Sequence, residues 1–177
     1  MGKGTPEHPV AVRAAGPRDL DALVALSLAC ARSRQEWAGA DWSAPALVTE
    51  RRLWWDRLSD TRSWVAAAEA GPTRVGCVAV WTRPHHAQRA YMVGPLVDPE
   101  WWGEGIGTAL YKQAMSVLGS RGYRRAELAV EAGNGPAREF LERRGWEQAE
   151  SLPARSAMAV LTYARELAGP APGAAAA

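Results

Sequence analysis

The sequence has only two cysteines and no apolar stretch that approaches the length of a membrane helix, which needs about 18 or more apolar residues. Cys30 and Cys77 both lie in apolar runs, which favours two buried free thiols over a disulfide or a catalytic pair. No apolar signal core follows Lys3, so we expect no signal peptide. These features predict a cytoplasmic protein with no membrane partner.

The sequence also lacks a strong charge of either sign. The net charge is +2, and the arginine pairs at 51–52, 124–125 and 143–144 are separate rather than gathered in one basic stretch. Charge therefore gives no reason to expect a nucleic-acid partner. There are only three histidines, and His85 and His86 fall in a predicted polar loop. We predict no metal site.

The apolar periodicity predicts one α/β domain, with elements in the order β-α-α-β-β-β-α-β-α-β-β. We assign the domain to residues 10–167 and expect disordered tails at 1–9 and 168–177. The predicted strands are Val10–Arg13, Trp64–Ala70, Arg74–Trp81, Tyr91–Val97, Arg125–Glu131, Trp146–Ser151 and Ser156–Tyr163. The predicted helices cover residues 16–36, 45–59, 106–118 and 135–144.

The most informative stretch runs from Ala90 to Arg121 and is typical of a strand, a glycine-rich turn and a helix. Gly103, Gly105 and Gly107 alternate with other residues directly before an amphipathic segment. The first turn of a helix has unpaired N–H groups and the positive end of the helix dipole. Glycines let this backbone approach a phosphate closely, so the pattern favours an anion site over a plain turn.

Two common phosphate-binding patterns are excluded. The sequence has no GxxxxGK[ST], so it has no P-loop. The segment GEGIG lacks the third glycine of GxGxxG and lies too late in the chain for an N-terminal dinucleotide-binding unit.

The stretch resembles the first motif of the GNAT superfamily of N-acetyltransferases, in which Gln/Arg-x-x-Gly-x-Gly/Ala follows a strand ending in Val-x-Pro. Val97-Asp98-Pro99 and residues 103–108 match this pattern. Trp102 occupies the Gln/Arg position, and Glu104 stands where the family often has a basic residue. The resemblance covers roughly residues 10–165.

A second motif of the same family lies further along the chain. After the strand 125–131 come Asn134, Ala137, Phe140 and Gly145-Trp146, in the family's order and spacing. Leu141 stands where the family commonly has a tyrosine that protonates the leaving thiolate. The resemblance implies a mixed, mostly antiparallel sheet that splays between its fourth and fifth strands and is flanked by helices.

The resemblance further implies transfer of an acetyl group from acetyl-coenzyme A, as co-substrate, to the primary amine of a small molecule or peptide. The residues that it assigns to cofactor binding are Pro95, Leu96, Val97, Gly103, Glu104, Gly105, Ile106, Gly107, Thr108, Asn134 and Phe140. Backbone N–H groups near Leu96 and Val97 would hold the thioester oxygen. Pro95 removes one donor there, as at a bulge or a strand edge.

The sequence also offers candidates for the catalytic residues. The candidates for the general base are Glu131, Glu127 and, through water, Tyr91, and of these we select Glu131 and Tyr91. His85 and His86 could also serve as bases, although paired histidines in a loop are usually solvated. Tyr163 and Tyr91 are the candidates for a proton donor in place of Leu141.

Two questions stay open at this point. Trp102, Glu104 and Leu141 depart from the family pattern. These departures favour the alternative, an acyl-CoA-binding module with little turnover. We expect the acceptor beside the first two helices and the loop from Trp37 to Trp42. The sequence does not identify the amine, and a homodimer is one possibility that it leaves open.

Overall fold

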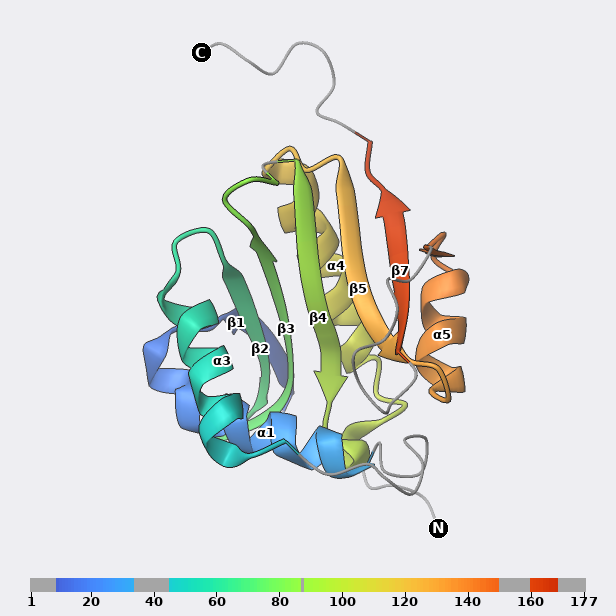
Figure 1. Ribbon diagram of the computed structural model, residues 1–177. Coiled ribbons are helices and arrows are strands. Elements are labelled where there is room, and N and C mark those ends of the chain that lie inside the picture. The colour runs from blue at the N-terminus through green and yellow to red at the C-terminus, as the bar shows by residue number, and fades with distance from the viewer. Residues whose placement is uncertain (1–8, 34–44, 87, 150–159, 169–177) are drawn as a thin grey trace.

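One mixed sheet organises the protein (Figure 1). The computed structural model describes residues 9–33, 45–86, 88–149 and 160–168, and in these ranges seven strands pair in the order β1-β2-β3-β4-β5-β7-β6. The strands are β1 (Val10–Ala14), β2 (Trp64–Ala70), β3 (Thr73–Thr82), β4 (Arg89–Val97), β5 (Arg125–Glu131), β6 (Glu147–Gln148) and β7 (Val160–Glu166). Only the β4–β5 pair is parallel among them. The mixed, mostly antiparallel sheet is therefore confirmed.

Helices cover both faces of the sheet. Helices α1 (Leu20–Ser33) and α3 (Leu47–Ser59) pack on one face at β2–β4, and α4 (Ile106–Ser120) packs on the opposite face (Figure 1). Helix α5 (Gly135–Glu142) contributes Leu141 to the core on the α4 side. Short 3-10 turns precede α1 and α4, at Pro17–Asp19 (η1) and Pro99–Trp101 (η2). No helix in the described ranges is long and apolar enough to cross a membrane.

The element order matches the sequence prediction, but several boundaries were wrong. The first helix begins with the 3-10 turn η1, and the second begins at Leu47 rather than Pro45. Strand β6 has two residues, while β7 extends to Glu166 because its last residues still pair with the start of β5. An ion pair of 2.6 Å between Arg125 Nη1 and Glu166 Oε1 joins these ends. Residues 34–36, 150–151 and 156–159 of the predicted elements lie outside the described residues.

Asp19 connects three elements near the start of the domain. Its carboxylate accepts hydrogen bonds from Arg13 (Nη2, 2.8 Å), Arg74 (Nε, 3.0 Å) and the backbone N–H of Gly16 (3.0 Å). These bonds, the Arg13 bond first, hold the pKa of Asp19 well below its ordinary value, although burial acts in the opposite direction. The carboxylate is 5% exposed, so its charge depends on these partners.

The sheet opens between β4 and β5, as predicted. The two strands pair only from Arg89↔Arg125 to Met92↔Leu128, after which β4 stays with β3 and β5 stays with β7. At the same point the β3–β4 register shifts, and Gly94 and Pro95 oppose the single residue Val78. This is a bulge, which bends a strand away from its neighbour.

Two positions next to the opening have room only for glycine, because a Cβ there would clash with neighbouring atoms. A Cβ on Gly94, whose φ is +84°, would lie 2.6 Å from the backbone nitrogen of Leu96. A Cβ on Gly76 of β3 would lie 2.9 Å from Leu110 Cδ1 and 3.0 Å from Ile106 Cγ2. Gly76 therefore lets the start of α4 pack closely against β3, next to the opening in the sheet.

Candidate active site

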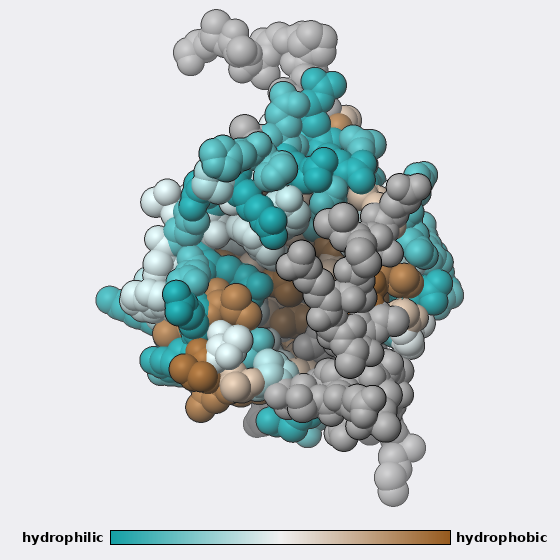
Figure 2. Space-filling model, viewed as in Figure 1, coloured by the Kyte–Doolittle hydropathy of each residue, from teal (hydrophilic) through white to brown (hydrophobic). Residues whose placement is uncertain are grey.

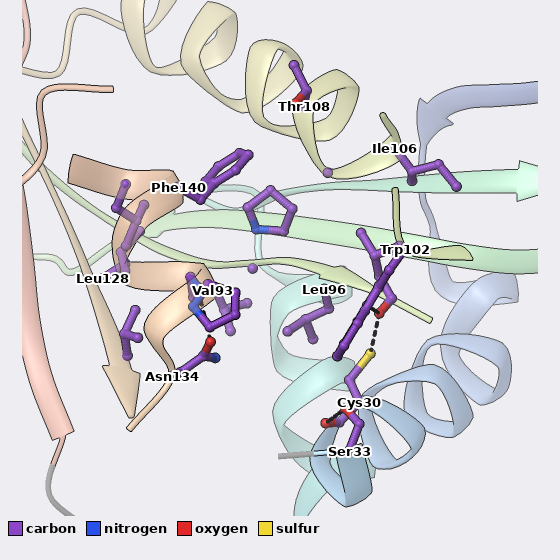
Figure 3. A pocket seen from close by; sticks show the side chains of 18 of the residues that line it. Cys30, Ser33, Val93, Leu96, Trp102, Ile106, Thr108, Leu128, Asn134 and Phe140 are labelled. Carbon is purple, nitrogen blue, oxygen red and sulfur yellow. Dashed lines mark hydrogen bonds between the residues drawn. The ribbon is translucent and has the colours of Figure 1, made fainter. Parts of the chain in front are cut away.

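A cavity of about 580 Å³ occupies the gap between the diverging strands (Figure 3). Its walls come from the end of α1, the second half of β4, the glycine turn, the end of β5 and the first turns of α5. The residues that line it include Cys30, Ser33, Val93–Val97, Trp102, Gly103, Gly105–Thr108, Leu128–Glu131, Asn134, Phe140 and Leu141. The cavity is thus a mostly apolar cleft with a few polar groups, which is the usual form of a small-molecule site.

The predicted cofactor residues gather around this one cavity. Ten of the eleven line it, and Glu104 alone is absent from its lining, as an exposed residue of the turn. Their assignment to a cofactor is a prediction.

The turn before α4 has the backbone shape expected of an anion site. Gly103 and Gly105 have φ of +92° and +77°, whereas Gly107 lies inside the helix without a left-handed φ. The first helical hydrogen bond is donated by Ala109 N to Gly105 O. The N–H groups of residues 106–108 therefore precede it and can converge on a phosphate at the positive end of the helix dipole.

Val97 fixes the opposite side of this turn. Its carbonyl oxygen accepts hydrogen bonds from the Trp102 indole Nε1 (2.8 Å) and from the Cys30 thiol (3.4 Å, Figure 3). Trp102, at the position where a Gln or Arg was expected, therefore closes the turn onto the end of β4. The Cys30 thiol joins α1 to the same carbonyl, which confirms that Cys30 is a buried free thiol.

Backbone alternation also gives the direction of the Val97 amide. The N–H of Asp98 donates to Val75 O of β3. Successive N–H groups of an extended strand point to opposite sides, so the N–H of Val97 points away from β3, toward the gap that β5 has left.

Arg144 supplies a positive charge near the glycine turn that sequence reasoning missed. Its guanidinium lies 3.6 Å from the Phe140 ring centroid and donates to Phe140 O (2.9 Å) and to Thr108 Oγ1 (3.3 Å). Thr108 belongs to the first turn of α4, so this contact brings the Arg144 guanidinium to the start of that helix. The one feature of the sequence that could have indicated the Arg144–Phe140 contact is the i, i+4 spacing of these two residues on a helix.

Asn134 combines a structural role with a place in the cavity wall. Its Oδ1 accepts from Ala137 N (3.1 Å) and caps α5, as predicted. No hydrogen bond within the described residues uses its Nδ2, so this amide donor is available to a ligand carbonyl. Leu141, four residues before Gly145, is buried and forms part of the same wall.

The structure separates the two candidate catalytic residues. Glu131 is 9% exposed and lines the cavity at the end of β5. Tyr91 does not line it; the ring stacks on Trp81 (6.0 Å between centroids) under the guanidinium of Arg83. Glu127 is occupied by ion pairs with Arg125 (2.8 Å) and Arg89 (3.4 Å). Glu131 is therefore the best-placed base of the three.

The structure does not bring the other candidates to the cavity. Tyr163 lies in the core on the α4 side, where its hydroxyl donates to Glu142 Oε1 (2.5 Å) and accepts from Arg138 Nε (3.2 Å). Burial, followed by the Glu142 bond, raises the pKa of Tyr163. His85 and His86 are exposed in the turn after β3. No tyrosine of the described residues lines the cavity.

The face that carries α1 and α3 also contains aromatic and cationic side chains. The predicted acceptor loop Trp37–Trp42 lies outside the described residues. In the described part, Arg57 of α3 lies over both Trp54 and Trp81, at 5.0 Å from each ring. Figure 2 shows a hollow with a hydrophobic floor near the middle of this face.

Comparison with known proteins gives a consistent result. Residues 29–146 match the family described as the acetyltransferase (GNAT) family. An uncharacterized N-acetyltransferase of Methanocaldococcus jannaschii is 46% identical over 55 residues, which are 31% of this chain and 24% of that protein. The chain thus matches only about a quarter of the length of this curated relative.

Solved structures match over nearly the whole chain. The PaiA N-acetyltransferase of Thermoplasma acidophilum, in complex with coenzyme A, has a TM-score of 0.70 and 16% identity, covering 90% of this chain and 99% of that one. The ribosomal-protein-S18-alanine N-acetyltransferase of Escherichia coli has a TM-score of 0.69 and 16% identity, covering 93% and 98%. At these identities the likeness concerns the fold alone.

Proposed function

The chain belongs to the acetyltransferase (GNAT) family, and on this premise we propose that it moves an acetyl group from acetyl-coenzyme A directly to a primary amine of a small molecule or peptide. The observation that carries the proposal is the cavity itself. It runs without interruption from the glycine turn of α4, past the free edge of β4, to Glu131.

Each part of acetyl-coenzyme A has a complementary part of this cavity. The pyrophosphate would accept from the N–H groups of residues 106–108, with Arg144 as the neighbouring cation. The pantetheine arm would lie between β4 and β5, within reach of Asn134. The N–H of Val97, directed into the gap, is the candidate donor to the thioester oxygen, together with the backbone near Leu96.

The reaction then needs one proton to leave the amine. An ordinary alkylamine has a pKa near 10.4 and is mostly charged at neutral pH. Glu131 would accept this proton while the amine nitrogen attacks the carbonyl carbon. The tetrahedral intermediate collapses by breaking the C–S bond, which yields the amide and the thiolate of coenzyme A.

The leaving thiolate does not require a tyrosine. A thiol pKa near 8.5 makes the thiolate a tolerable leaving group, and protonation by solvent completes the reaction. Leu141 in the cavity wall is compatible with this route.

The experiment that tests the base is the substitution Glu131→Gln. We expect kcat to fall by about 10²–10⁴-fold because general base catalysis is lost, while calorimetry gives an unchanged affinity for acetyl-coenzyme A. Glu139→Gln, an exposed residue of α5, is the matched control. An unchanged kcat in Glu131→Gln would remove Glu131 from the mechanism.

A second function has one observation in its favour. Leu141 and the absence of a cavity-lining tyrosine in the described residues fit an acyl-CoA-binding module with little turnover. Tight binding of acetyl-coenzyme A without thiol release, across a broad panel of amines, would favour that alternative.

A further inference from the structure

Arg57 occupies an unusual position between α3 and the sheet. Its guanidinium carbon lies 5.0 Å from the ring centroid of Trp54 and 5.0 Å from that of Trp81. Trp81 stacks on Tyr91 of β4, and the guanidinium of Arg83 lies over the Tyr91 ring at 4.7 Å from its centroid. We call Trp54, Arg57, Trp81, Tyr91 and Arg83 the arginine–aromatic cluster.

Two strong donors in this cluster have no hydrogen-bond acceptor among the residues that the structure describes. Within the described residues, no hydrogen bond or ion pair uses the Arg57 guanidinium, although it is half-buried. The indole Nε1 of Trp54 is fully buried and also has no hydrogen-bond partner in the described part of the chain. Buried polar groups of a native protein are nearly always hydrogen-bonded, and a desolvated cation is costly without an anion.

The neighbouring acids do not satisfy Arg57. Glu50 acts on it from beyond ion-pair distance and accepts a hydrogen bond from Ser27 (2.8 Å) instead. Asp56 is exposed and also acts only at longer range. Burial consequently lowers the pKa of Arg57 more than these charges raise it. Perturbed groups of this kind concentrate at functional sites.

We propose that the arginine–aromatic cluster binds a carboxylate of the acceptor, so that the acceptor is an amine that also carries a carboxylate. A guanidinium presents paired N–H donors that match the two oxygens of a carboxylate. The indole faces hold the guanidinium in place by cation–π contacts and leave its N–H edge for the ligand. The inference rests on the proposed acetyl transfer, because it names the acceptor of that reaction.

The position of the cluster fits this role. Trp81 is directly opposite Tyr91, and Val93, which lines the cavity, is two residues further along β4 on the same face. Diagonal neighbours of this kind lie about 7–8 Å apart. The cluster and this part of the cavity wall therefore lie next to each other on the same face of β4.

The first test measures binding without turnover. Protein labelled with ¹⁵N is saturated with coenzyme A, and the Arg57 Nε–Hε and Trp54 Nε1–H signals are assigned by their loss in Arg57→Gln and Trp54→Phe. The probes are 4-aminobutanoate against 4-aminobutanamide, and glycylglycine against glycylglycinamide. We expect the acids to shift the Arg57 signal saturably and to bind about 10- to 100-fold more tightly than the amides.

The second test uses turnover and a matched control. With acetyl-coenzyme A, the acid of each pair should have the higher kcat/KM by a similar factor. Arg57→Gln should bring this ratio close to one, whereas Arg52→Gln, an exposed residue of the same helix, should preserve it. Unchanged coenzyme A affinity in Arg57→Gln will show that the fold is intact.

The outcomes separate the inference from the proposed function. Equal shifts by acids and amides, or no saturable shift of the Arg57 signal by either acid, would overturn the carboxylate site even in an active enzyme. Failure of the protein to bind acetyl-coenzyme A would instead remove the proposed function.

Discussion

A substitution at Gly107 is the best way to disturb cofactor binding without disturbing the fold. It lies in the first turn of α4 and lines the cavity, and a Cβ placed there would meet only Val97 Cγ2, at 3.7 Å. That is an ordinary van der Waals contact, and no left-handed φ has to be preserved at this position. Gly107→Val should therefore fold, yet place two methyl groups where a phosphate has to approach the backbone.

The size of the effect follows from the bonds that are lost. Hydrogen bonds to charged groups contribute roughly 1.5–3 kcal/mol each. Loss of two N–H bonds to the pyrophosphate then raises the Kd of acetyl-coenzyme A by about 10²–10⁴-fold. Removing a helical glycine stabilises the fold by a few tenths of a kcal/mol, so Tm should change by only about 1–2 °C. Gly107→Ala should give a smaller loss of affinity.

Calorimetry with acetyl-coenzyme A and a thermal melt provide the two readouts. Gly119→Val is the control, because Gly119 lies in the last turn of the same helix with no atom within 4 Å of its Cβ position. Gly105→Ala should lose stability as well as affinity, because its φ of +77° is costly for other residues. If Gly107→Val bound acetyl-coenzyme A within threefold of the wild type, the phosphate assignment would be refuted.

Three further predictions concern other parts of the molecule. Glu104→Lys should tighten acetyl-coenzyme A binding, more so at low salt; an affinity that is unchanged in low-salt calorimetry would mean that this side chain points away from the phosphates. Leu141→Tyr should raise turnover or leave it unchanged, at a packing cost of about 1–3 kcal/mol in denaturant melts; a large fall in kcat with normal cofactor binding would contradict a route without a tyrosine. Asp19 has a lowered pKa in the folded protein, so its stabilisation is present above the unfolded pKa near 3.9 and is lost as the pH falls below it. Asp19→Asn should lower the unfolding free energy at pH 7 by about 3 kcal/mol or more and by less near pH 3; an equal loss at both pH values would show that the charge is not responsible.

Local patterns predicted much of the site. The alternation of glycines in GEGIG and the amphipathic residues after it located the turn and α4, because backbone conformation and helix periodicity are short-range properties. Pro95 indicated an interruption in β4, and the bulge lies there. Asn134 was recognised as a helix cap for the same local reason.

The parts that were missed depend on contacts between distant segments. Cys30 enters the cavity wall only because the end of α1 passes the end of β4, and Gly76 matters only because α4 packs over it. Arg57 and Trp81 are well separated in the chain and meet through the packing of α3 on the sheet. Tyr163 was a candidate proton donor in the sequence. The register of β7 instead directs its hydroxyl to Glu142 of α5, which the sequence alone could not show.

The central claim is that this cavity takes the acetyl group from acetyl-coenzyme A and gives it to an amine. The most direct measurement incubates the wild-type protein with [acetyl-¹³C]acetyl-coenzyme A and an amine panel that includes the carboxylate-bearing probes. Mass spectrometry then follows the labelled product, and a thiol assay follows coenzyme A. The account predicts a ¹³C-acetylated amide formed in equal amount to the released coenzyme A, with loss of both in Glu131→Gln. Release of coenzyme A as free acetate alone, or no release at all, would contradict it.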